Sequence, residues 1–184
     1  MTTRPHDHPL LTSPAGRWLR IVFVAVLCAW VVRAFVAESI YNASASMEKT
    51  LPAGTHAVLD KISLRLRSPR RGDIVVFPSP LGETKDMIKR VIGVEGDAVE
   101  LRAKNVYING RILSEPYARH SRADERLEGD DLGPMVVPED CLFVLGDNRD
   151  VSNDSSVWRD PKTGERIYFV KISSVKGILR GFFH

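Results

Sequence analysis

The sequence predicts a mainly β protein, built from folded antiparallel β-sheets, with one N-terminal transmembrane helix. From residue 38 onward, short runs rich in Val, Ile and Phe alternate with Gly, Pro, Asn and Asp, as in strands separated by turns. No long 3.6-residue periodicity occurs in that part of the chain, and a single long apolar stretch precedes it. About eight short strands in one domain favour an antiparallel sheet that closes or folds over on itself.

The composition agrees with one folded domain plus a short appendage. The chain has 184 residues, of which 43% are hydrophobic and 27% charged, so collagenous, disordered and multi-span membrane proteins are excluded. Lys and Arg total 26 against 23 Asp and Glu, a net charge of +3. This small excess is spread along the chain and does not call for a nucleic acid partner.

The apolar stretch at residues 18–37 has the length of about 20 residues that crosses a hydrocarbon core. Its two arginines, Arg20 and Arg33, lie near the ends, where long side chains reach the lipid headgroups. A cleavable signal peptide is the alternative, with the small residues at 43–45 as its cleavage site.

Arginines precede the apolar stretch and Glu38 follows it, and this bias places the N-terminus in the cytoplasm. We therefore expect a cytoplasmic tail at residues 1–17, a transmembrane anchor at 18–37 and an extracytoplasmic β-rich domain at 38–184.

The β-rich domain contains eight runs that we predict as strands. They are residues 56–62, 73–77, 87–94, 98–102, 105–108, 113–116, 141–145 and 167–172. Asn109-Gly110 predicts a hairpin turn, because a type I′ turn needs positive φ at both central residues. Gly96-Asp97 is expected to turn the chain between two paired strands, and the charged segment 120–133 is expected to be a surface loop.

Neither a disulfide nor a metal site is predicted. Cys28 lies in the apolar stretch and Cys141 in a predicted strand, so the two sulfur atoms are not expected to meet. No His or Cys pair has the spacing of metal ligands. The β-rich domain contains His56 and His120 in addition to the last residue, His184. We interpret His56 and His120 as surface side chains.

A serine and a lysine are the first candidates for chemistry. Strand alternation places Lys89 on one face between the apolar Met87 and Val91. Desolvation there disfavours the ammonium and leaves an amine able to take a proton from a hydroxyl such as that of Ser46. The alternative is that Lys89 reaches solvent from a strand edge and Ser46 only caps a turn.

The polar segment at residues 146–155, GDNRDVSNDS, is a third candidate element. It follows an apolar strand and is rich in groups that bond to one another, which predicts an internal hydrogen-bond network. Taken alone, the segment is most simply a structural scaffold, and the alternatives are a cation-binding loop or a solvated loop.

Four segments in this order resemble the type I signal peptidases. The resemblance covers the segment around Ser46 at 44–51, the strand at 71–77, the segment around Lys89 at 88–93 with Gly96-Asp97, and the polar segment at 146–155. Four such segments after one membrane span are far more specific than any single motif. The resemblance implies folded antiparallel sheets of the signal-peptidase type.

The resemblance also implies roles for individual residues. Ser46 is the nucleophile, Lys89 the general base, and Ser152 the hydroxyl that orients the lysine. The hydroxyl of Ser44 and the N–H of Ser46 form the oxyanion hole. Three charged residues of the polar segment support the site without taking part in the chemistry: Asp147, Arg149 and Asp154.

No cofactor or metal is implied. The partners implied are the signal peptides of exported preproteins and membrane lipids, with no nucleic acid. The implied location is the bacterial inner (plasma) membrane, with a single span, a cytoplasmic N-terminus and an extracytoplasmic catalytic domain.

The chain departs from the family pattern at three places. Lys49 stands where the family usually has Pro, and Ser156 replaces an Arg, which removes the expected partner of Asp154. Residues 159–165 look inserted. Two alternatives remain at this point: a self-cleaving repressor-like serine–lysine protease and an exported β-rich binding module.

Overall fold

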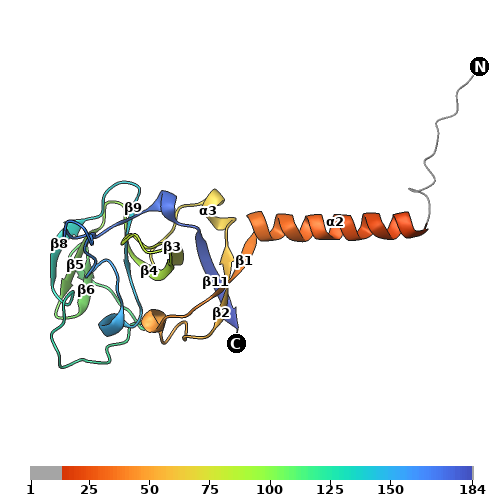
Figure 1. Ribbon diagram of the computed structural model, residues 1–184. Coiled ribbons are helices and arrows are strands. Elements are labelled where there is room, and N and C mark those ends of the chain that lie inside the picture. The colour runs from red at the N-terminus through yellow and green to blue at the C-terminus, as the bar shows by residue number, and fades with distance from the viewer. Residues whose placement is uncertain (1–13, 184) are drawn as a thin grey trace, which may run out of the picture. The chain divides into compact units, whose positions relative to one another are not determined.

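The computed structural model describes residues 14–183, which form two units, one ending at Ala37 and the other starting at Glu38 (Figure 1). The first unit contains helix α2, Pro14–Phe35. Its 22 residues correspond to about 33 Å of helix. Proline suits the first helical position, because the missing N–H has no partner there in any case. The observed helix thus begins before the predicted residue 18 and ends before residue 37.

Among residues 14–183, α2 is the helix that is long and apolar enough to cross a membrane, judged by length and composition. The window Pro14–Val31 has a mean hydropathy of 1.5, and its side chains are almost all exposed. An apolar helix that leaves its side chains uncovered is the expected form of a membrane span.

The second unit consists of two β-sheets, as the sequence predicts. The larger sheet has seven strands in the order β1, β2, β11, β3, β4, β9, β10, and the smaller has four in the order β7, β6, β5, β8. The larger sheet is formed by β1 (Ala37–Tyr41), β2 (His56–Asp60), β3 (Ile74–Pro78), β4 (Asp86–Val94), β9 (Cys141–Leu145), β10 (Val170–Lys171) and β11 (Gly177–Phe183). The smaller is formed by β5 (Ala98–Arg102), β6 (Asn105–Ile108), β7 (Arg111–Ile112) and β8 (Leu132–Val136).

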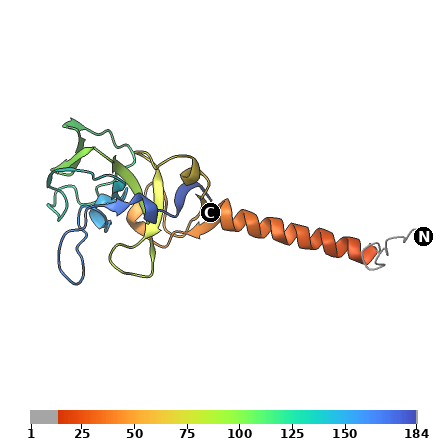
Figure 2. The ribbon, with the colours of Figure 1, turned by 90° about the horizontal axis from the view of Figure 1, so that it is seen from above.

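Short helices complete this unit: α3 (Ser63–Leu66) and the 3₁₀ turns η1 (Ala45–Met47), η2 (Arg149–Val151) and η3 (Ile172–Ser174). Figure 1 shows the smaller sheet at one side of the unit and β2 with β11 at the other. Figure 2, seen from above, shows the connection from β3 to β4 as a loop that extends from the body.

Three hydrophobic clusters hold these layers together. One contains Phe77 and Trp158, whose rings meet edge to face at 6.0 Å. The second joins the two sheets, with Phe143 of β9 against Val99 of β5. The third fixes the turn around η1, because Met47 is fully buried in it. The element that carries Ser46 is therefore anchored by apolar packing on its buried side.

The predicted strands at 98–102, 105–108 and 141–145 agree with the observed bounds. The predicted strand at 113–116 is wrong, because strand β7 ends at Ile112 and only the N–H of Leu113 still bonds across the hairpin, to the carbonyl oxygen of Val106. The strands β1, β8 and β11 were not predicted, and only Val170–Lys171 of the run 167–172 forms a strand.

The two turn predictions have different outcomes. Asn109 and Gly110 have φ of 52° and 76°, which confirms the type I′ signal. Gly96 also turns the chain, with φ of 80°, but the strands that it connects, β4 and β5, belong to different sheets. The prediction that these two strands pair is wrong.

Candidate active site

Ser46 lies in the 3₁₀ turn η1, where Ser44 is the N-cap. The N–H of Ser46 donates to the hydroxyl oxygen of Ser44 at 3.1 Å. This is a standard cap, in which a short side chain satisfies an N–H that has no partner within the turn. It places the Ser44 hydroxyl and the Ser46 N–H side by side, as the implied oxyanion hole requires.

Lys89 lies in the middle of β4 and contacts Ser46, although the two residues are 43 positions apart in the sequence. The distance between Lys89 Nζ and Ser46 Oγ is 2.8 Å. Both residues are buried, with 4% and 7% of their surface exposed. Met87 and Val91, the neighbours on the same face of β4, pack in one hydrophobic cluster. The fold therefore places the amine in apolar surroundings against a hydroxyl.

Burial lowers the pKa of Lys89 from its ordinary value, because the ammonium loses its hydration. The carboxylates of Asp154 and Asp147 act in the opposite direction, since negative charge stabilises the ammonium. Desolvation is the larger effect, so a neutral amine is available closer to neutral pH than in an exposed lysine.

Ser152 caps the end of η2 and lies against the nucleophile turn. Its hydroxyl is buried and has no hydrogen-bond partner among residues 14–183. A side chain at Gly146 would collide with the Ser152 hydroxyl and with the carbonyl oxygen of Ser46. Glycine at 146 thus allows the two segments to approach each other. The resemblance implies a contact between Ser152 and the Lys89 amine, but no hydrogen bond joins these two groups.

Asp147 is fully buried and forms a bidentate ion pair with Arg90 of β4, at 2.7 Å from Nε and 2.6 Å from Nη2. The Arg90 guanidinium lies over the ring of Tyr117 at 4.0 Å, a cation–π contact. Arg90 follows Lys89 in sequence, so strand alternation aims the two cations at opposite faces of β4.

Only 7% of the Arg149 side chain is exposed, and its Nη2 donates to Glu115 Oε1 at 2.6 Å. Its Nε donates to the carbonyl oxygen of Gly146 at 3.0 Å. Asp154 accepts bonds from Gly146 and Ser156. The three charged residues implied as supports thus connect the polar segment to Arg90 of β4 and to Glu115 and also bond groups within the segment, and none of them is hydrogen-bonded to Ser46.

Sequence reasoning missed several residues that hold the nucleophile turn. The backbone N–H of Asn148 donates to the carbonyl oxygen of Ser46 at 3.0 Å, and its side-chain amide donates to that of Ala45 at 3.2 Å. The same amide reaches Glu48, which is paired with Arg119. Asn148 belongs to the GDNRDVSNDS segment, so its position within that segment was the available signal.

The hydroxyl of Ser46 opens into a cleft of about 590 Å³. Besides Ser46, the cleft is lined by residues 40–44, by Glu83 and residues 85–89, and by Val151 and Asn153. Residues 86–89 of β4 pair with β3, whereas pairing with β9 begins only at Arg90. Within residues 14–183, the stretch 86–89 of β4 thus has a strand partner on one side only, and it lines the cleft.

The described histidines and cysteines take no part in this site. His56 is exposed, and His120 lies 3.7 Å from Asp150. The two cysteines are free. Within residues 14–183 no group of three or more His, Cys, Asp or Glu side chains is arranged to hold a metal ion. The remaining histidines, 6, 8 and 184, lie outside the described residues.

The chain is similar to known signal peptidases along most of its length. Residues 15–183 match the family described as signal peptidase, peptidase S26. A probable signal peptidase I-2 of Synechocystis sp. is 43% identical over 155 residues, which are 80% of this chain and 68% of that protein. Signal peptidase I of Bacillus licheniformis is 37% identical over 75% of this chain and 76% of its own length.

A solved structure of signal peptidase I from Enterococcus faecalis is 35% identical, covers 62% of this chain and 98% of that chain, and has a TM-score of 0.47. The family match spans both the segment around Ser46 and the segment around Lys89. The chain therefore belongs to the signal peptidase family, peptidase S26, whose members are serine endopeptidases.

Proposed function

We propose that this chain is a membrane-anchored endopeptidase that removes signal peptides from exported preproteins with a dyad of Ser46 and Lys89. The observation that carries the proposal is the 2.8 Å distance between the Lys89 amine and the Ser46 hydroxyl inside an apolar surround. A lysine whose pKa is lowered by burial fills the place that histidine takes in other serine proteases.

In the first step the neutral Lys89 amine takes the proton from the Ser46 hydroxyl as the serine oxygen attacks the scissile carbonyl. The carbonyl oxygen becomes an oxyanion beside Ser44. Without substrate, the N–H of Ser46 donates to the Ser44 oxygen. During the reaction this N–H donates to the oxyanion instead, and the Ser44 O–H is the second donor. Loss of one such donor costs about 10²–10³ in kcat.

In the second step the Lys89 ammonium gives its proton to the leaving amine, and the C–N bond breaks. The signal peptide stays bound to Ser46 as an ester. Lys89, neutral again, deprotonates a water that attacks this ester. The bond between the acyl carbon and the Ser46 oxygen then breaks, the signal peptide leaves with a new C-terminal carboxyl group, and Lys89 returns the proton to the Ser46 oxygen. No step requires a cofactor or metal.

The cleft suits an extended peptide. The side of residues 86–89 that has no strand partner within residues 14–183 offers backbone groups for pairing, and a segment bound in this way adds a strand to the sheet. In an extended segment, alternate side chains point the same way, so the residue before the cut and the one two positions earlier face the same wall. We propose that both positions take small side chains, as the family resemblance implies.

We infer that α2 anchors the chain, with the N-terminus in the cytoplasm and the catalytic domain outside, in the plasma membrane of a bacterium. The length and apolar surface of α2 support the anchor. Arg17 and Arg20 near the start of α2, and Glu38 just after it, support the orientation. Protection of the domain from external protease in intact spheroplasts would overturn this orientation.

The dyad is tested by cleavage of a preprotein in vesicles. Ser46→Ala, Lys89→Met and Lys89→Arg are each expected to lower kcat by at least about 10³-fold. Arginine fails because its guanidinium stays protonated at every relevant pH. Exposed residues supply the matched controls, Ser68→Ala and Lys162→Met, which should leave cleavage unchanged. Retained activity in any of the three dyad variants contradicts the proposal.

A further inference from the structure

We propose that Lys104 and Asp150 form an ion pair that positions the catalytic segment, although neither residue contacts Ser46 or Lys89. The inference rests on the proposed function. Lys104 lies in the turn between β5 and β6 of the smaller sheet, and Asp150 is the central residue of η2. The pair therefore connects the smaller sheet to the segment that carries Ser152.

Lys104 is held in place at both its backbone and its ammonium. Its φ of 69° lies in the left-handed region, and that of Ala103 is 45°. Its Nζ lies 3.0 Å from Asp150 Oδ1 and 3.4 Å from Asp130 Oδ2, and donates to the carbonyl oxygen of Arg122 at 3.0 Å. These three acceptors match the three N–H groups of an ammonium.

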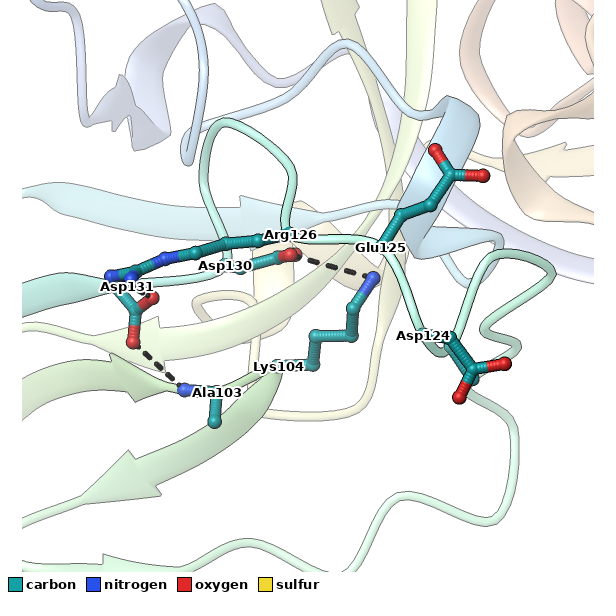
Figure 3. Close-up of a pocket in the computed structure, with 8 residues that line it drawn as sticks. Ala103, Lys104, Asp124, Glu125, Arg126, Asp130 and Asp131 are labelled. Atoms are coloured by element: carbon teal, nitrogen blue, oxygen red, sulfur yellow. Dashed lines mark hydrogen bonds and ion pairs between the residues drawn. The ribbon is translucent and has the colours of Figure 1, made fainter.

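Figure 3 shows the Lys104 side chain directed to Asp130, while Asp124 and Glu125 point away from it. The pocket drawn there has a volume of about 370 Å³ and lies over the turn that carries Lys104. The Lys104 side chain is 13% exposed and its contact with Asp150 is partly buried, so this pair is partly shielded from water. Pairs of this kind are much more costly to break than surface pairs.

The Asp150 side chain has no exposed surface. Its carboxylate also accepts the N–H of Arg122 at 2.6 Å, and the Nδ1 of His120 lies 3.7 Å away. Burial by itself raises the pKa of Asp150, but the Arg122 N–H and the Lys104 ammonium lower it below its ordinary value. The carboxylate is therefore charged at neutral pH, and without Lys104 it would be a buried charge lacking its closest cation.

Two of the contacts that hold the polar segment lie just before the turn η2 and within it. At one, Asn148 bonds the carbonyl oxygen of Ser46. At the other, Asp150 is bonded to Lys104, and Ser152 follows two residues later. The first contact fixes the segment to the nucleophile, whereas the second fixes it to the smaller sheet. Release of the second contact lets η2 and the Ser152 hydroxyl move relative to Lys89.

A positioning role predicts a loss in kcat with little change in KM. Lys104→Met and Asp150→Asn should each lower the kcat of the full-length, membrane-inserted enzyme by about 10- to 100-fold. Lys104→Arg, which keeps the charge, should recover most of the loss. The double variant should be no worse than either single variant, because the two residues act through one contact.

The pH profile separates positioning from simple destabilisation. A displaced segment admits water to Lys89, which raises the pKa of the amine toward that of a free lysine and moves the acid limb of kcat to higher pH. Loss of folded protein alone lowers activity at every pH and leaves the limb in place. Activities are therefore divided by the folded fraction measured by circular dichroism.

Arg126→Met is the matched control. Arg126 pairs with Asp131 at 2.8 Å in the same pocket, but the pair is largely exposed and does not reach the polar segment (Figure 3). Unchanged kcat and pH profile in folded Lys104→Met or Asp150→Asn would overturn the inference, as would an equal loss in Arg126→Met. If Ser46→Ala and Lys89→Met remain active, the proposed function fails instead.

Discussion

Ser156 donates two hydrogen bonds to the same carboxylate oxygen of Asp154, from its N–H at 3.0 Å and its hydroxyl at 2.7 Å. The other oxygen of Asp154 accepts the N–H of Gly146 at 2.9 Å. The family pattern has an arginine at position 156, and its replacement led us to expect that Asp154 would lose its partner. The expected loss does not occur, because a short hydroxyl next to the carboxylate replaces the long guanidinium.

Ser156→Ala should lower the free energy of unfolding by about 1–2 kcal/mol, because Asp154 is buried and loses its shortest hydrogen bond. Urea denaturation measures the change. Ser174→Ala is the control, since the Ser174 hydroxyl bonds a carbonyl oxygen at an exposed site and should cost less. Equal losses of unfolding free energy in the two variants would show that the buried hydrogen bond stabilises the fold no more than the exposed one.

Asp154→Asn should move the acid limb of kcat to lower pH. The Asp154 carboxylate raises the pKa of Lys89 against the larger, opposite effect of burial. Without this negative charge the pKa falls further, so the amine is neutral over a wider range at the acid side. A kcat profile from about pH 5 to 9 on folded protein tests this. Asp160→Asn, in an exposed turn, should leave the limb unmoved, whereas a shift of Asp154→Asn to higher pH would contradict the assignment.

Asn148→Asp should lower kcat by about 10-fold and the free energy of unfolding by about 1–3 kcal/mol. The substitution keeps the shape but removes the amide that donates to Ala45, and it places a second carboxylate near Glu48. Asn148→Ala, which adds no charge, should be milder. Asn105→Asp changes an exposed amide and serves as the control. Equal activity of Asn148→Asp and wild type would remove Asn148 from the support of the nucleophile turn.

Lys49→Gly should stabilise the fold by about 0.5–1 kcal/mol, because Lys49 has a φ of 81°, which glycine adopts without strain. Lys49→Pro, which restores the usual family residue, should cost about 1–3 kcal/mol, since proline cannot reach that angle. Thermal or urea unfolding measures both. Lys162→Gly is expected to destabilise slightly, and a gain there comparable to that of Lys49→Gly would contradict the argument from φ.

The sequence predicted those parts of the fold that depend on local pattern. Alternation placed Lys89 between Met87 and Val91, and the structure confirms that these neighbours share one cluster. The Asn109-Gly110 turn follows from the backbone preferences of two residues. Strand pairing depends on contacts distant in sequence, so the turn at Gly96 could be predicted but not the change of sheet that follows it.

The support of the candidate site was harder to predict than its reactive groups. The partner of Arg149 is Glu115, which lies in a segment wrongly predicted as a strand. The partner of Asp150 is Lys104, in a turn that no motif marks. Ion pairs of this kind depend on where loops meet after the sheets have formed, and spacing along the chain contains no measure of that distance.

The separation of Ser46 and Lys89 by 43 residues has a consequence for the newly made protein. In an unfolded chain the lysine is hydrated, carries its proton at neutral pH and has no serine beside it. Under the proposed mechanism, folding of the chain into its sheets is therefore what creates the reactive serine. Before folding is complete, Ser46 is an ordinary hydroxyl and Lys89 an ordinary ammonium group, so the chain would not cleave neighbouring proteins.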